Sequence, residues 1–248
     1  MNQYNYNGRV QGQEPLYEQV MQNAGATTQR AADVMMSEEG SISRRAYNAI
    51  IGLIVLWGVG IDTAICYFYG DKLLQTFKNS WAMVLIYLGL VIGGTVIVNM
   101  AKNAVISFIG YNLIVVGFGV TLSMVVGMYQ PAIVLEAFLV TTIVTAVMLL
   151  LGTLWAEMFE KLGRILCVCL IALIITEFVM ILITGTYPTW ISVISAIIFC
   201  GFIGYDWSKA QKSPSTAKNA VLFATSLYVD IVNLFLNILR IVGGSSSD

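Results

Sequence analysis

Residues 132–155 read AIVLEAFLVTTIVTAVMLLLGTLW, an apolar run with one charged side chain, Glu136. A membrane-spanning helix needs about 20 such residues to cross roughly 30 Å of hydrocarbon. The run is apolar on every face, whereas a transmembrane β-strand alternates apolar and polar residues. This stretch therefore predicts a helix that crosses a membrane.

Further runs of the same kind lie on both sides of this one, separated by short polar or charged segments. Residues 70–72 are expected to close the first span, and the charged residues within 156–164 are expected to precede the fifth. The expected spans cover residues 46–69, 80–101, 104–128, 132–155, 165–184, 189–210 and 218–242. We therefore expect an all-α membrane protein, a bundle of seven transmembrane helices.

The composition excludes most other classes. Hydrophobic residues make up 58% of the 248 residues and charged residues only 11%, too little charge to cover a soluble domain. The charges balance to -1 without clustering, so no nucleic-acid partner is expected. The chain has no histidine, and its four cysteines lie inside apolar runs. Histidine-based catalysis and a resident metal or cofactor are therefore not expected, and the protein is not expected to be an enzyme.

Three regions are expected along the chain. Residues 1–43 form a polar N-terminal arm, expected to be flexible, with a short helix around residues 15–23 where Leu16 and Val20 recur at helical spacing. Residues 44–242 form the transmembrane domain, and residues 243–248 form a short tail. The arm lacks the basic and apolar segments of a cleavable signal.

Basic residues predict the orientation, because they favour the cytoplasmic ends of spans. With a cytoplasmic N-terminus, three basic residues fall on the outer side, namely Lys72, Lys78 and Arg240. Eight fall on the inner side, namely Arg44, Arg45, Lys102, Lys161, Arg164, Lys209, Lys212 and Lys218. We therefore expect a cytoplasmic N-terminus and an outer C-terminus, although a last span that entered and returned would place the C-terminus and Arg240 inside. The compact length and the absence of a cleavable signal favour a bacterial plasma membrane.

The charged residues deep inside the expected spans are all acidic, since Lys209, Lys218 and Arg240 lie at span ends. A charge in the membrane costs roughly 2.5–3.5 kcal/mol on insertion scales, so each one needs a partner, a bound cation or water. The five acidic residues are Asp62, Glu136, Glu177, Asp206 and Asp230. The first three are candidates for an ion pathway, and Asp62 and Glu136 are close enough to the outer end to snorkel or to line a vestibule.

Asp206 and Asp230 lie on the last two expected spans, which are antiparallel and joined by a short loop. A modest tilt would bring their carboxyl groups together. Two carboxylates in a low dielectric cannot both ionise easily, so one proton would be shared. Such a pair would hold two helices together when protonated, and would repel or transiently capture a divalent cation such as calcium when ionised.

The same two spans resemble the Bax inhibitor-1 family, including its bacterial members. Residues 201–206 read GFIGYD, like the end of the family's sixth helix, and residues 227–236 read LYVDIVNLFL, like its last helix. Weaker similarity covers Glu136-Ala137-Phe138 and the loop at residues 160–163. The resemblance extends over about residues 44–242.

This resemblance implies a seven-helix bundle with the last helix central, acting as a pH-sensitive calcium leak channel with calcium as the permeant ion. It assigns the pH sensor and gate to Asp206 and Asp230. The family also has an arginine near the inner end of its second helix that latches the first of these aspartates. The nearest basic residue here is Lys102, which cannot form a bidentate contact.

Other functions fit the same residues. A proton-coupled cation transporter would use the acidic side chains as carriers, and inverted repeats would favour it, but the sequence contains no evident repeat. A non-conducting membrane regulator would act through membrane-protein partners bound to the arm or the cytoplasmic loops. An intramembrane aspartyl protease is disfavoured, since Asp230 lacks the glycines that such enzymes carry before the second aspartate.

Overall fold

The computed structural model describes residues 40–77, 81–184 and 188–245. The helices in these stretches are α2 (Arg44–Phe77), α3 (Trp81–Met100), α4 (Ala104–Val126), α5 (Pro131–Leu154), α6 (Ala156–Thr184), α7 (Thr189–Lys212) and α8 (Ala217–Ser245). The chain divides into two units, Met1–Ser41 and Ile42–Asp248, and these helices belong to the second. The helix expected at residues 15–23, Lys78 and residues 246–248 lie outside the described residues.

Local sequence explains where two of the helices begin. Pro131 occupies the first turn of α5, where its missing N–H costs nothing. Asn103 precedes α4, and its side chain accepts a hydrogen bond of 2.9 Å from the Ile106 N–H. These caps lie in the short connections that sequence analysis placed between spans.

Three helices are longer than the sequence predicted. α2 continues through residues 70–72 to Phe77, and α6 begins at Ala156, so the charged residues within 156–164 form its first turns. α8 continues through Gly243 and Gly244 to Ser245. For α2 and α6 the reason is that hydropathy marks only the apolar part of a helix, while residues such as Lys72, Glu157 and Lys161 also favour helix where it leaves the hydrocarbon. The extension of α8 through two glycines is not explained by helix propensity.

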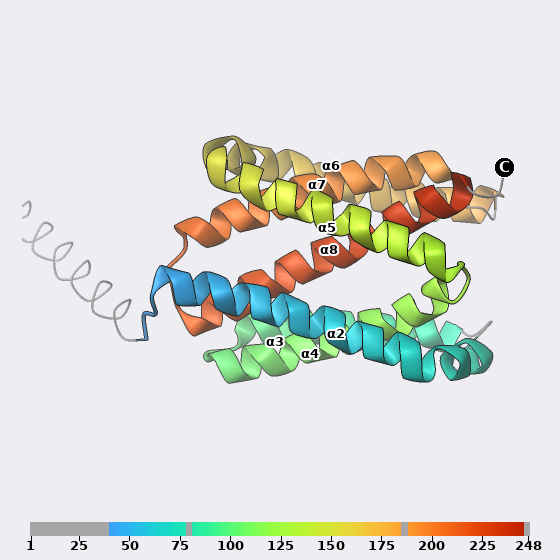
Figure 1. Ribbon diagram of the computed structural model, residues 1–248, viewed down its shortest axis with the longest axis horizontal. Coiled ribbons are helices and arrows are strands. Elements are labelled where there is room, and N and C mark those ends of the chain that lie inside the picture. The colour runs from blue at the N-terminus through green and yellow to red at the C-terminus, as the bar shows by residue number, and fades with distance from the viewer. Residues whose placement is uncertain (1–39, 78–80, 185–187, 246–248) are drawn as a thin grey trace, which may run out of the picture. The chain divides into compact units, whose positions relative to one another are not determined.

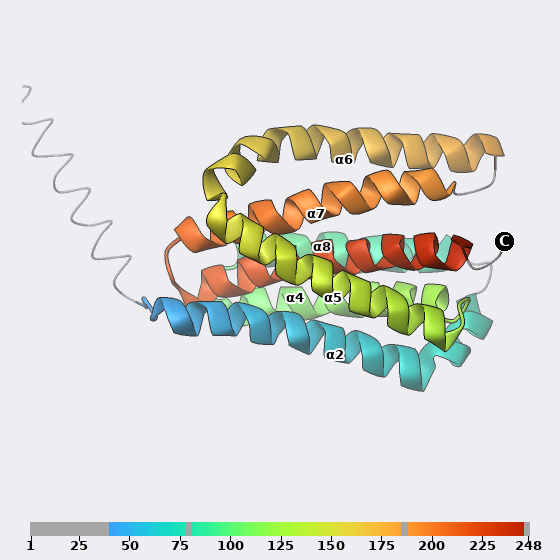
Figure 2. The same cartoon turned by 45° about the horizontal axis from the view of Figure 1, so that its top comes forward.

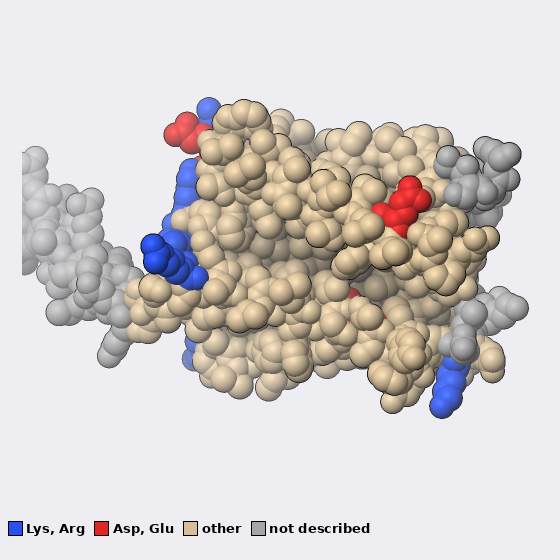
Figure 3. Space-filling view, in the orientation of Figure 1, with Lys and Arg blue, Asp and Glu red and all other residues tan. Residues whose placement is uncertain are grey.

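The surface of the bundle suits a lipid environment. Six of the described helices are long and apolar enough to cross a membrane, and α3 supplies a shorter apolar stretch, Val84–Met100. Large apolar side chains point outward, and Leu56, Ile143 and Ile175 are all more than half exposed. On the face seen in Figure 3 the basic side chains lie only near the two ends. The predicted all-α membrane fold is confirmed.

The last helix, α8, lies at the centre of the bundle. It packs against α2 and α4 on one side and against α5 and α7 on the other, as Figures 1 and 2 show. Two thirds of its apolar length (67%) is buried inside the protein, against 11% for α5 and for α6. The central position that the family resemblance implied for the last helix is confirmed.

The remaining six helices form two groups of three. In the first group α4 packs against both α2 and α3, and in the second α7 packs against both α5 and α6. Successive helices alternate in direction, so α2 and α5 enter their groups from opposite ends (Figure 1). The two groups therefore share one packing order in inverted orientation, although the sequence shows no evident repeat.

A glycine pair forms a close crossing inside each group. A Cβ at Gly94 of α3 would lie 2.6 Å from the Gly110 carbonyl oxygen of α4. A Cβ at Gly152 of α5 would lie 2.6 Å from the Gly204 carbonyl oxygen of α7. In a membrane the hydrophobic effect does not drive two helices together, because the lipid tails are as apolar as the side chains. Close backbone approach instead increases the van der Waals contact between the helices.

Candidate functional site

The structure brings Asp206 and Asp230 together. Asp206 lies two turns before the end of α7, Asp230 lies in the middle of α8, and their side chains hydrogen-bond to each other. α8 crosses the bundle obliquely (Figure 1), which supplies the tilt that the sequence required. Ionised carboxylates only accept hydrogen bonds, so a bond between these two groups needs a proton on one of them.

Other polar groups surround this pair. Ser226 of α8 hydrogen-bonds to Asp206, and the charge of Lys209, one turn further along α7, acts on the same carboxyl. The Lys209 ammonium also lies 5.7 Å from the centre of the Tyr205 ring. Asp230 is only 7% exposed, and its Oδ2 atom is buried without a hydrogen-bond partner. The pair therefore has one member near a cation and one member deep in the bundle.

A cavity of about 830 Å³ runs beside the pair, between α3, α4, α6, α7 and α8. Its charged lining residues are Glu177, Asp206, Lys209, Asp230 and Arg240. Asparagine side chains line it as well, namely Asn99, Asn233 and Asn237. The cavity thus reaches along α8 from the level of Lys209 to that of Arg240, with the carboxyl pair on its wall.

Asp62 lies on the opposite side of α8, and not in an outer vestibule. It is 2% exposed, and its Oδ2 atom accepts a hydrogen bond of 2.6 Å from the Tyr228 hydroxyl of α8. The other oxygen, Oδ1, is buried without a hydrogen-bond partner. Asp62 therefore does not snorkel to the membrane surface, because α4 and α8 enclose it.

The remaining predicted residues lie apart from the aspartate pair. Glu136 is exposed near the start of α5 and does not line the cavity. Lys102 is exposed in the turn between α3 and α4. The basic side chain whose charge acts on Asp206 is Lys209, which the sequence analysis used only to orient the chain.

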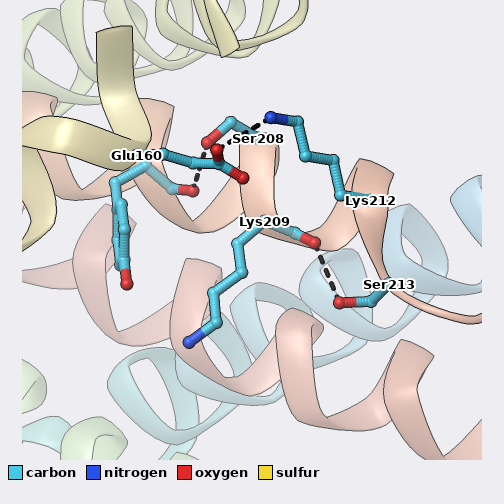
Figure 4. A network of polar contacts seen from close by, with 6 residues as sticks. Glu160, Ser208, Lys209, Lys212 and Ser213 are labelled. Carbon is cyan, nitrogen blue, oxygen red and sulfur yellow. Dashed lines mark hydrogen bonds and ion pairs between the residues drawn. The ribbon is translucent and has the colours of Figure 1, made fainter. Parts of the chain in front are cut away.

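Polar contacts tie the helices together at the end that carries most basic residues. Arg44 of α2 donates to the carbonyl oxygens of Ala210 (3.2 Å) and Ser213 (3.0 Å), at the end of α7. Lys212 forms an ion pair of 2.8 Å with Glu160 of α6, which Figure 4 shows beside Lys209. These contacts could not be predicted from the sequence, since hydropathy carries no information on which helix ends meet.

Comparison with known proteins gives the class. The family profile described as "Inhibitor of apoptosis-promoting Bax1" matches residues 40–247. A BI1-like protein of Arabidopsis thaliana is 39% identical over 143 residues, which are 53% of this chain and 55% of that protein. A Golgi anti-apoptotic protein of vaccinia virus is 36% identical over 126 residues, covering 49% of this chain and 52% of that protein.

A third relative matches over a greater length. An uncharacterised membrane protein of Streptococcus pyogenes is 28% identical over 232 residues, 85% of this chain and 98% of that protein. The match thus spans about half the length of the plant and viral relatives and nearly all of the streptococcal one. The family profile covers most of the chain, and the protein belongs to the Bax inhibitor-1 family.

Proposed function

We propose that this protein is a pH-sensitive, calcium-permeable leak channel gated by Asp206 and Asp230. The observation that carries the proposal is the placement of this hydrogen-bonded carboxyl pair on the wall of the long cavity beside α8. The pair combines a proton-dependent contact between two helices with a space that a hydrated ion could use.

The gate works through the number of protons on the pair. With one shared proton, Asp206 holds α7 and Asp230 holds α8 in contact, and the pathway is closed. When that proton leaves, two negative charges face each other in a low dielectric and repel. α7 and α8 then separate, and the exposed carboxylates attract calcium. Opening is therefore expected to increase as the pH rises.

Glu177 and Arg240 mark the far end of the same pathway. Both line the cavity, on α6 and α8 respectively. A calcium ion that moves along α8 would pass Glu177 and then the aspartate pair before it reaches Lys209. We place the basic end of the bundle in the cytoplasm and the Arg240 end outside, in a bacterial plasma membrane.

The test is calcium flux into proteoliposomes at several pH values. We expect flux in the wild type to rise between about pH 6 and about pH 8, as the shared proton is released. Asp206→Asn combined with Asp230→Asn should remove that rise, because two amides remain hydrogen-bonded at every pH. Glu136→Gln is the matched control, since Glu136 is exposed outside the cavity. Flux in the double variant that still follows pH would contradict the proposal.

One observation favours a second function, a proton-coupled cation transporter. The inverted relation of the two three-helix groups is an arrangement from which many secondary transporters are built. In such a protein the aspartate pair would carry protons in exchange for the cation. Proton counterflow with calcium, followed by a pH dye inside the vesicles, distinguishes the two, because a leak channel moves calcium without a fixed proton ratio.

A further inference from the structure

α8 is held by carboxyl contacts on two opposite faces. Tyr228 and Asp230 are two residues apart, which places their side chains about 200° apart around the helix axis. Asp230 faces Asp206 of α7, and Tyr228 donates its hydrogen bond to Asp62 of α2. The two contacts lie at nearly the same depth, one on each side of the central helix.

The Asp62 side is packed too tightly for the tyrosine to move freely. A Cβ at Gly58 would meet the Tyr111 hydroxyl and would lie 2.8 Å from the Tyr228 ring. A Cβ at Gly119 would lie 2.9 Å from the Asp62 Oδ1 atom. The Tyr228 ring also packs edge-on against the rings of Tyr111 and Phe118, at 5.4 and 6.0 Å between centroids. Glycines thus make room for Tyr228 and Asp62 where α2, α4 and α8 meet.

The groups around Asp62 are neutral side chains. The titratable side chains that interact with its carboxyl are Tyr228 of α8, Tyr111 of α4 and Cys66 of α2. Among the described residues only Tyr228 hydrogen-bonds to it. A buried carboxyl without a cation beside it is energetically costly, so a functional role is expected to offset that cost. The hydrogen bond from this carboxyl to the central helix points to such a role.

We propose that Asp62 and Tyr228 are the positioning pair of the gate: their hydrogen bond fixes the depth of α8 and so holds Asp230 opposite Asp206. Asp62 contacts no permeating ion and acts through Tyr228 and α8. Without the bond, α8 can slide or turn, the contact between Asp206 and Asp230 weakens, and the pathway opens at a lower pH. The proposal rests on the gate described above.

Tyr228→Phe removes the hydrogen bond at nearly constant volume, Asp62→Leu removes it with a larger side chain, and Asp62→Asn keeps an oxygen that accepts it. Tyr111→Phe is the matched control, because the Tyr111 hydroxyl donates to the Ile54 carbonyl oxygen of α2 and not to α8. Each variant of the full chain is reconstituted into lipid, and two quantities are measured. The first is amide hydrogen exchange in residues 224–236, and the second is the pH profile of calcium flux.

We expect Tyr228→Phe and Asp62→Leu to speed exchange in α8 by roughly tenfold, the effect of losing one hydrogen bond to a carboxyl. Their flux should rise at acid pH, which moves the midpoint to lower pH, while Asp62→Asn and Tyr111→Phe stay close to the wild type. Unchanged exchange and an unchanged pH profile in Tyr228→Phe would overturn the proposal. A wild-type protein without calcium flux would instead refute the proposed gate. In that case the amide hydrogen exchange of α8 would still test whether Asp62 and Tyr228 hold this helix in place.

Discussion

The two faces of α8 bury the same chemical group in opposite surroundings. On the α7 face, Asp230 meets a second carboxyl beside a cavity of about 830 Å³. On the α2 and α4 face, Asp62 meets a tyrosine hydroxyl in a region where glycines permit close packing, and neither Asp62 nor Tyr228 lines the cavity. Both carboxyls are more than nine-tenths buried.

The difference shows that burial alone does not define the role of an acidic residue in a membrane. A carboxyl paired with another carboxyl changes the contact when a proton leaves, because the bond becomes a repulsion. A carboxyl that accepts a bond from a tyrosine keeps the same bond in either protonation state, since its oxygen remains an acceptor. The first arrangement suits a switch and the second suits a fixed support.

The packed face should respond most strongly to added volume. Gly58→Ala places a methyl group against Tyr111 and Tyr228, and we expect a loss of roughly 1–3 kcal/mol in the free energy of unfolding. Gly60→Ala is the control, since no atom lies within 4 Å of a Cβ at that position. Thermal unfolding in detergent should show a lower midpoint for Gly58→Ala only. Equal midpoints for the two variants would mean that this face is not tightly packed.

The cavity face should respond to a change of charge without a loss of stability. Glu177→Gln removes a negative charge from the cavity lining, and we expect calcium flux to fall about threefold, less than 1 kcal/mol in the barrier. Its pH midpoint should stay unchanged, because Asp206 and Asp230 are intact. Glu136→Gln should leave the flux unaltered. A larger loss of flux in Glu136→Gln than in Glu177→Gln would place the pathway outside this cavity.

The ends of the bundle should matter least. Lys212→Ala breaks the ion pair with Glu160, whose partners are 46% and 42% exposed. Exposed pairs contribute about 0–1 kcal/mol, so the unfolding midpoint should change little. A fall as large as that of Gly58→Ala would show that the contact between α6 and α7 at this end supports the whole bundle.

Much of the fold could be predicted from the sequence because each helix is apolar over most of its length. The limits of α3, α4 and α5 follow from polar residues such as Lys102 and Gln130. The extensions at residues 70–77 and 156–164 could not be predicted, since they leave the apolar region and depend on ordinary helix propensity. The inverted relation of the two helix groups could not be predicted either, because packing order leaves no repeat in the sequence.

The candidate site likewise has one contact that the sequence predicts and one that it does not. The meeting of Asp206 and Asp230 follows from two antiparallel neighbouring helices that place them at similar depth, so that a modest tilt brings them together. The contact between Asp62 and Tyr228 joins residues 166 positions apart and depends on how α2 and α8 are rotated about their axes. The polar residues of α8 mark one of its faces, but α2 is apolar on nearly every face and carries no signal for its rotation.

The most direct test of the central claim is the pH dependence of calcium flux in Asp230→Asn beside that of the wild type. In the variant, the amide can donate to Asp206 at every pH, so the contact between α7 and α8 no longer depends on a shared proton. We predict that wild-type flux rises about tenfold from about pH 6 to about pH 8, while flux in Asp230→Asn stays low and flat. A variant with the same rise as the wild type would contradict the account.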